Sequence, residues 1–380
     1  MKTEQSIYSE ARGWVKKSDN HLGNLAKLVF LFGHKDLLKN QLHIDYVRSL
    51  YPLAEVVGCS TSGEIFNEEV YNNNIICTAV WFENTQIEIA REQVDSMDDS
   101  TKVGHNLAER LDKEGLVHIM ILSEGLNING SELTNGINDK LNNRISVTGG
   151  LAGDQANFSE TVIVHNRAGE KNLVLAIGFY GHHLKIGYGS VGGWDSFGVD
   201  REVTRSKGNI LYEVDGQPAL DLYKKYLGVH VADLPASALL FPISFRPNNS
   251  ETAIVRTVLS INEADGSMVF AGDIPQGENI RLMKANANRL IDGASDAAEM
   301  SRVSLRNSDP DLAVLISCVG RKLVLKQKVE EELEVIREVL GNDTTITGFY
   351  SYGEISPTKP FEQHCELHNQ TMTITLFKEV

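Results

Sequence analysis

Gly58-Cys-Ser-Thr-Ser-Gly-Glu-Ile65 is the stretch that decides the fold, because it recurs near the C-terminus as Gly348-Phe-Tyr-Ser-Tyr-Gly-Glu-Ile355. Both copies read Gly-x-x-x-x-Gly-Glu-Ile. A looser copy, Gly149-Gly-Leu-Ala-Gly-Asp154, is one residue shorter and ends in aspartate. Glycine allows tight turns and lets other groups approach the backbone closely. The three copies therefore predict an internal repeat built around three glycine-rich turns.

Each copy lies in the same order of predicted elements. A short apolar run precedes an amphipathic helix, a second short strand leads into the turn, and a longer apolar strand follows. In the first unit we expect a helix that carries Leu42, Tyr46, Val47 and Leu50 on its apolar face. The predicted strands are residues 28–32, 54–57 and 75–82, then 117–122, 145–148 and 173–180, then 312–316, 344–347 and 372–377, with further helices over 133–141 and 329–340.

This order predicts an α/β or α+β fold in which helices cover mixed β-sheets. We expect the first two strands of a unit to pair in parallel through a right-handed crossover, and the strand after the turn to run antiparallel. Between the second and third units, the pattern predicts a hairpin over residues 203–214, a helix over 219–227 and a polar helix over 279–297. A division near residue 200 gives two expected domains, residues 1–200 and 201–380.

The composition excludes several classes of partner. Of 380 residues, 36 are Lys or Arg and 51 are Asp or Glu, so the net charge is −15. A negative field of this size disfavours nucleic acid and anionic membranes, and neither is expected as a partner. The four cysteines lie far apart and form no Cys-x-x-Cys pair, which predicts a reducing, cytoplasmic setting.

Further motifs extend the pattern. They are Gly193-Trp-Asp-Ser-Phe-Gly198 with Val203-Thr204, then Leu211-Tyr-Glu-Val-Asp-Gly-Gln-Pro-Ala-Leu-Asp-Leu-Tyr223, and finally Leu367-His-Asn-Gln-Thr-Met372. Together with the glycine turns, they make the chain resemble the FIST family over nearly its whole length, with an N-terminal and a C-terminal FIST region. The resemblance implies a sensory domain that binds a small-molecule ligand and acts on a partner signalling protein.

The resemblance also implies a more specific function. Some stand-alone members of the family are haem proteins that sense nitric oxide and regulate histidine kinases. On this basis we expect haem b as a cofactor and a sensor histidine kinase as a partner. The oligomeric state stays open, with a homodimer as one option.

The glycine turns are the expected ligand site. The carboxylates of Glu64 and Glu354 could recognise an amine, and Trp194 could stack on a flat ligand. The alternative is that the turns only reverse the chain and that the two carboxylates accept local N–H groups. A Walker phosphate loop is disfavoured, because Glu and not Lys follows the second glycine. The candidate ligand-binding residues are Gly58, Cys59, Ser60, Gly63, Glu64, Gly149, Gly150, Asp154, Trp194, Tyr352, Gly353 and Glu354.

Two histidines are candidate iron ligands. His165 and His368 each precede asparagine at matching places in the repeat, and neutral imidazole suits iron. Together with Cys365 they form the expected metal-binding set. The alternative for each histidine is a turn residue that is hydrogen-bonded to the backbone. Arg246 and Arg256 are expected to be surface charges.

A non-enzymatic sensor is therefore the predicted function, and two alternatives stay open. The first is a sensor of amino acids or other small metabolites. The second is a hydrolase or transferase that uses Cys59. No Gly-x-Ser-x-Gly elbow surrounds Ser60, and no histidine pairs with Cys59 by spacing, so catalysis is the weaker hypothesis.

Overall fold

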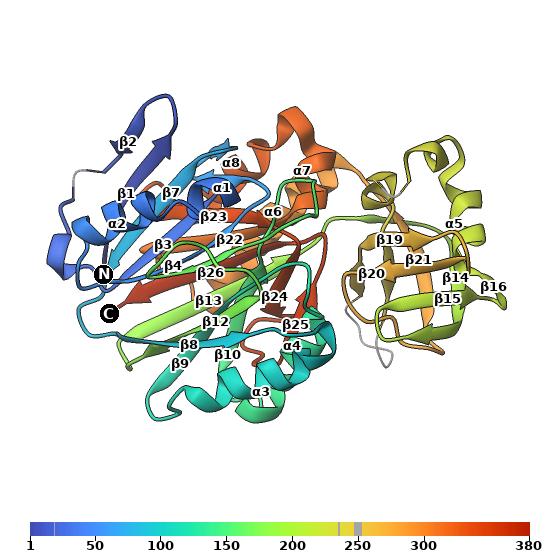
Figure 1. Cartoon of the computed structure of the whole chain (residues 1–380), viewed down its shortest axis with the longest axis horizontal. Coiled ribbons are helices and arrows are strands. Elements are labelled where there is room, and N and C mark those ends of the chain that lie inside the picture. Colours follow the sequence, from blue (N-terminus) through green and yellow to red (C-terminus); the bar gives the residue numbers. More distant parts are fainter. Residues whose placement is uncertain (19, 235, 247–252) are drawn as a thin grey trace.

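The long strands of the repeat are buried on both faces, because helices cover one side of each sheet and other sheets cover the opposite side. In the computed structural model, the described residues (1–18, 20–234, 236–246 and 253–380) form three six-stranded sheets and one eight-stranded sheet. Figure 1 shows the three six-stranded sheets gathered in one body and the remaining sheet set to one side. The predicted class, mixed β-sheets covered by helices, is confirmed.

Each of the three six-stranded sheets combines a parallel pair with antiparallel neighbours. We number them in chain order. Sheet 1 runs β11 (Ile163–His165), β4 (Glu55–Ser60), β3 (Leu28–Gly33), β7 (Ile75–Trp81), β1 (Lys2–Ser9), β2 (Gly13–Lys16). Sheet 2 runs β25 (Cys365–His368), β24 (Gly353–Pro357), β10 (Ser146–Leu151), β9 (Leu116–Ser123), β12 (Leu173–Tyr180), β8 (Gln86–Gln93). Sheet 3 runs β13 (Leu184–Val191), β26 (Met372–Glu379), β22 (Leu312–Cys318), β23 (Thr345–Ser351), β5 (Glu64–Phe66), β6 (Glu69–Tyr71).

Helices cover the outer face of each sheet. Sheet 1 packs against α1 (Lys35–Leu38) and α2 (Gln41–Leu50), and sheet 2 against α3 (Ser100–Arg110) and α4 (Gly130–Leu141). Sheet 3 packs against α6 (Ala287–Ser304) and α8 (Glu331–Leu340), with α7 (Val319–Leu325) following β22. The inner faces share one core, in which Phe30, Phe32, Leu122, Val314 and Phe377 are fully buried. We call these three sheets and their helices the three-sheet body.

In each unit, the short strand after the glycine turn pairs with a strand of a neighbouring sheet and not with its own sheet. After residues 58–64 the chain forms β5, which pairs antiparallel with β23 of sheet 3. After residues 149–154 it forms β11, which pairs with β4 of sheet 1, and after residues 348–354 it forms β24, which pairs with β10 of sheet 2. The three sheets are therefore linked in a closed cycle. The chain then returns to its own sheet as β7, β12 and β26, each antiparallel to the first strand of its unit.

The first glycine of each turn lies where two backbones come close together. It is paired with a residue of the parallel neighbouring strand, and a Cβ at the glycine would collide with that residue's carbonyl oxygen. The pairs are Gly58 with Leu31, Gly149 with Ile121 and Gly348 with Leu315, where the Cβ would lie 1.8, 2.1 and 1.9 Å from the oxygen. These glycines are thus required by the packing of the strands, independently of any ligand.

A smaller unit, which we call the β-unit, lies between β13 and α6. Its strands are β18 (Ile254–Arg256), β17 (Ile243–Phe245), β21 (Asn279–Lys284), β14 (Asp195–Lys207), β15 (Ile210–Val214), β20 (Ser267–Phe270) and β19 (Val258–Asn262), with β16 (Gln217–Pro218) on β15. The helix α5 (Ala219–Leu227) closes its core. Figure 1 shows the β-unit beside the three-sheet body, joined by the segments before β14 and after β21.

Arg256 fastens the β-unit to the three-sheet body. Its guanidinium donates to the carbonyl oxygens of Asp273 (3.2 Å) and Leu367 (3.0 Å), and it lies 3.4 Å from the Ser131 hydroxyl. The expectation of a surface charge was wrong for this residue, because it is 4% exposed, whereas Arg246 is exposed. A buried arginine cannot be recognised from its local sequence when its partners are distant carbonyl groups.

Two local predictions were also wrong. In α2 the buried residues are Ile44 and Val47, whereas Leu42 is 73% and Tyr46 42% exposed. The predicted helix over residues 279–297 begins instead as strand β21, and α6 starts only at Ala287, where the Asn286 side chain caps the helix by accepting from the Arg289 N–H. Among the described residues, no helix combines the length and apolar character needed to cross a membrane.

The expected division at residue 200 stays a prediction. Pairing between strands crosses it at several places, since β5 pairs with β23, β10 with β24, and β13 with β26. Strands from before and after residue 200 thus share two of the three six-stranded sheets.

Replacing Gly58 or Gly348 by alanine tests the close approach of the strands. Neither glycine has a positive φ, so the cost comes from the collision with the carbonyl oxygen. We expect each substitution to lower the free energy of unfolding by about 1–3 kcal/mol, as measured by urea denaturation. Gly192→Ala is the control, because a Cβ there meets only ordinary contacts at 3.4 Å or more. An equal effect at all three positions would contradict the packing argument.

Candidate functional site

The three glycine turns meet and are joined by backbone hydrogen bonds. The Ser62 N–H donates to the Tyr350 carbonyl (2.7 Å), and the Tyr350 N–H donates back to Gly63 (2.8 Å). The Gly153 N–H donates to the Ser60 carbonyl (2.8 Å), and the Tyr352 N–H donates to Leu151 (3.2 Å). The structure therefore brings together the candidate residues that the sequence placed on separate turns. They are buried there, with the fully enclosed residues Gly58, Cys59, Gly149 and Gly150 inside the strands that lead into the turns.

Glu64 and Glu354 occupy matching positions and have matching partners. Each accepts from the hydroxyl three residues earlier, Thr61 (2.7 Å) or Ser351 (2.5 Å). Each also accepts from the backbone N–H that precedes the returning strand, at Asn74 (3.3 Å) or Thr371 (3.2 Å). This arrangement matches the structural alternative, in which the carboxyls satisfy N–H groups of the chain.

Burial changes the ionisation of both carboxyls. Desolvation raises the pKa of Glu64 to about 7 and that of Glu354 to about 8, against the partial compensation of their hydrogen bonds. Both groups therefore hold a proton over part of the neutral range. A buried carboxylic acid of this kind is a weak partner for a ligand amine.

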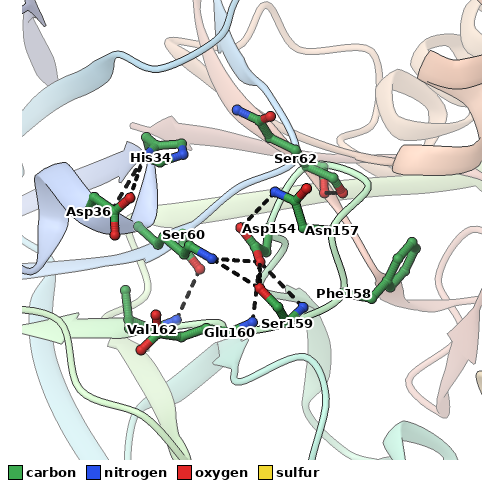
Figure 2. A network of polar contacts seen from close by, with 12 residues as sticks. His34, Asp36, Ser60, Ser62, Asp154, Asn157, Phe158, Ser159, Glu160 and Val162 are labelled. Atoms are coloured by element: carbon green, nitrogen blue, oxygen red, sulfur yellow. Dashed lines mark hydrogen bonds and ion pairs between the residues drawn. The ribbon is translucent and has the colours of Figure 1, made fainter.

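Asp154, the acidic residue of the shorter turn, has a different environment. It accepts from the Lys35 ammonium (2.8 Å), the Ser159 hydroxyl (2.6 Å) and the N–H of Glu160 (3.2 Å). Figure 2 shows Asn157, Ser159 and Glu160, from the loop that follows the turn, around the Asp154 carboxylate, with Ser60 nearby. Burial alone would raise its pKa, but the hydrogen bonds from Lys35 and Ser159 outweigh that effect and lower it. Asp154 is thus an ionised, fully engaged carboxylate that orders the loop over residues 155–160.

A lysine from the third unit reaches the first turn in a similar way. The Lys322 ammonium donates to the Ser62 carbonyl (2.6 Å) and contacts the Asn72 side chain. Desolvation lowers its pKa, although the Glu64 carboxyl acts in the opposite direction. A Cβ at Gly63 would lie 2.4 Å from the lysine nitrogen, and the φ of +151° at Gly63 is one that other residues rarely adopt.

Three further ligand-binding candidates have protein partners or are buried; Trp194 lies away from the turns, whereas Ser60 and Cys59 belong to the first turn. The Trp194 ring is buried at the start of the β-unit, and its N–H donates to the Gln370 carbonyl (2.9 Å). The Ser60 hydroxyl accepts from the Val162 N–H (3.0 Å). Burial raises the pKa of the Cys59 thiol well above its ordinary value, so the thiolate needed for nucleophilic attack is scarce at neutral pH.

The three expected metal ligands do not come together. His165 lies 3.0 Å from the Glu55 carboxylate at the edge of sheet 1. His368 contacts the Ser356 carbonyl (3.0 Å), and the Cys365 thiol donates to the Asn138 amide oxygen (3.3 Å). Within the described ranges, no three His, Cys, Asp or Glu side chains are grouped so that they could hold a metal ion. A metal bound through these residues would have to displace their protein partners.

A cavity of about 610 Å³ lies where the loop after the second glycine turn, α7 and the β-unit meet, and we call it the junction cavity. Its size falls within the range of small-molecule pockets, about 300–1,000 Å³. Phe158 connects it to the turns, because its ring stacks on Tyr352 at 4.4 Å and its N–H donates to the Tyr352 hydroxyl (3.1 Å). The walls are mainly apolar, with a few polar groups among them; they are formed by Ala156, Asn157, Phe158, His230, Asp233, Leu234, Ser237, Leu239, Leu240, Val258, Leu259, Leu323 and Lys326.

Of the candidate residues from the sequence, Tyr352 touches the wall of this cavity through Phe158, and Asp154 touches it through Asn157. The wall residues themselves carry no motif, because they come from four segments that only the tertiary structure brings together. In the sequence, the aromatic residues beside the turns, Tyr352 and Phe158, are the feature that could have indicated this cavity.

The raised pKa values of Glu64 and Glu354 predict how stability depends on pH. Both acids ionise near 4.5 when unfolded and at about 7 and 8 when folded. The folded chain thus binds more protons between these values, and its free energy of unfolding should fall as the pH rises from about 5 to 8. Urea denaturation across this range should show a shallower fall in the double variant Glu64→Gln/Glu354→Gln. A slope as steep as in the exposed control Glu10→Gln/Glu114→Gln would refute this assignment.

Comparison with known proteins agrees with the motif pattern. The FIST N domain matches residues 27–217 and the FIST C domain matches residues 219–357. Uncharacterized protein MJ1623 of Methanocaldococcus jannaschii is 23% identical over 385 residues, covering 88% of this chain and 70% of its own.

Similarity to solved structures is weak. Cyanuric acid hydrolase from A. caulinodans aligns with 93% of this chain and 90% of its own, at 8% identity and a TM-score of 0.32. PurLQS from Thermotoga maritima aligns with 84% and 74%, at 8% identity and a TM-score of 0.20. Neither score supports an argument about fold or activity. The two domain matches do: the chain belongs to the FIST family, whose domains are sensory domains for small ligands in signalling.

Proposed function

We propose that this protein is a non-enzymatic sensor that binds its ligand in the junction cavity and regulates a partner signalling protein. The observation that carries the proposal is the position of the cavity, whose walls come from both the three-sheet body and the β-unit. A ligand that touches both can shift their relative arrangement by its differential affinity for the two arrangements. The loop after the second glycine turn forms one wall, which would connect a bound ligand to the place where the three sheets are linked.

The most specific version of the proposal is haem b bound for sensing nitric oxide. The cavity supplies three features that suit haem: leucine side chains along its walls, the imidazole of His230 and the ammonium of Lys326. His230 would hold the iron, the leucines would contact the porphyrin, and Lys326 would pair with a propionate. Bound haem would supply the iron that reacts with nitric oxide. In this version the expected iron ligand is His230, which lines a cavity, instead of His165, His368 or Cys365.

The geometry gives less support to the two alternative functions, an amino-acid sensor and a hydrolase or transferase. An amino-acid sensor built on Glu64 or Glu354 needs a carboxylate that a ligand can reach, and both side chains are buried. A hydrolase or transferase built on Cys59 needs an accessible thiolate, and the thiol is buried with a raised pKa.

The expected partner is a histidine kinase or another signalling protein in the cytoplasm. All four cysteines are free and buried, which suits a reducing compartment. A partner protein would bind the surface near the junction cavity, where it would respond to a change in the arrangement of the β-unit.

Haem reconstitution tests the specific version. The purified protein should develop a Soret band on addition of haem, and the band should shift on addition of nitric oxide. His230→Ala should remove or shift the band, whereas the exposed control His182→Ala should leave it unchanged. If no band forms, or if His230→Ala has no effect on it, haem binding through His230 is excluded.

A second experiment tests the junction cavity without assuming haem. Leu259 lines the cavity and is 38% exposed, so Leu259→Trp should fill the space while the fold is kept. Thermal-shift screening with haem and with small metabolites should find a ligand that raises the melting temperature of the natural chain but not of this variant. A ligand that stabilises both proteins equally would place the site elsewhere.

A further inference from the structure

A second hollow lies on the three-sheet body, away from the junction cavity. Its volume is about 540 Å³, and we call it the basic groove. It is formed by the starts of β9, β10 and β13, the end of α6 and the loop before β25. The lining residues are Leu116, Val117, Arg144, Ile145, Ser146, Leu184, Lys185, Ile186, Tyr188, Ser304, Leu305, Arg306, Phe361 and Gln363.

The charge of this groove is opposite to that of the protein as a whole. The chain carries a net charge of −15, yet the groove is lined by Arg144, Lys185 and Arg306 and by no acidic residue. The three cations come from three separate elements and are exposed, and none forms an ion pair with a described residue. Cations that line one hollow without counter-charges in an acidic protein indicate a place for an anionic ligand.

The loop that carries Phe361 is held in position over the groove. The Tyr188 hydroxyl donates to the Glu362 carbonyl, and the His364 ring contacts the Asn143 side chain (3.1 Å) beside Arg144. Phe361 itself has φ +64° and a 56% exposed side chain. A bulky residue in this conformation, with its ring left open beside a hollow, is unusual and provides a stacking face.

We propose that the basic groove binds a nucleotide, with its phosphates on Arg144, Lys185 and Arg306 and its base on Phe361. Guanidinium groups form strong, charge-assisted hydrogen bonds to phosphate oxygens, and every base can stack on an aromatic ring. The volume of the groove lies within the range of small-molecule sites. This site is separate from the junction cavity, so the protein would respond to two ligands.

Binding of a fluorescent ADP carrying an N-methylanthraniloyl group tests the proposal. Arg144→Gln, Lys185→Gln and Arg306→Gln should each weaken its binding about tenfold, because each removes one charge-assisted contact. Inorganic pyrophosphate should compete with the labelled ADP. Phe361→Ala should weaken the labelled ADP but leave pyrophosphate binding unchanged, which separates the phosphate from the ring.

Three exposed cations outside the groove provide matched controls: Arg48→Gln, Lys102→Gln and Lys207→Gln change the charge equally and should have no effect on binding. Far-ultraviolet circular dichroism checks that each variant is folded. Absence of binding by the natural chain at millimolar protein would overturn the proposal. Equal weakening by the groove variants and the controls would also overturn it, since only the overall charge would then matter.

Discussion

The close approach of strand backbones at three glycines is the constraint on which the rest of the structure depends. After each of them the chain leaves one sheet and adds a short strand to a neighbouring sheet. The three sheets are thereby linked in a cycle. A side chain at any of these positions would push two strands apart. The packing of the strands therefore explains the repeated glycine pattern. A role in ligand binding is not needed to account for it.

This constraint also leaves little open space at the centre of the three-sheet body. The centre, where the turns meet, is filled by buried carboxyls, hydroxyls and lysines that satisfy one another and the backbone. Open space instead occurs at the margin, where the loop after the second turn meets the β-unit through Phe158 and Tyr352. The junction cavity thus lies between the three-sheet body and the β-unit, whereas the centre of the turns is closed by its own hydrogen bonds.

The sequence predicted the mixed sheets well, because long apolar runs such as residues 312–316 have few alternatives to a buried strand. It did not reveal that β5, β11 and β24 belong to neighbouring sheets, since these strands are short and their pairing is set by distant partners. The faces of α2 were misjudged because Leu42 and Tyr46 are apolar yet exposed. His230 was missed as a cavity residue because its neighbours there, such as Phe158 and Leu323, are remote in sequence.

Hydrogen–deuterium exchange under mild denaturant, followed by mass spectrometry, tests the cyclic link most directly. β5, β11 and β24 are the strands that link neighbouring sheets. If the sheets depend on one another through them, peptides from these strands should open with the same free energy as peptides from β3, β9 and β22. A result in which one sheet exchanges while the other two stay protected would contradict the account.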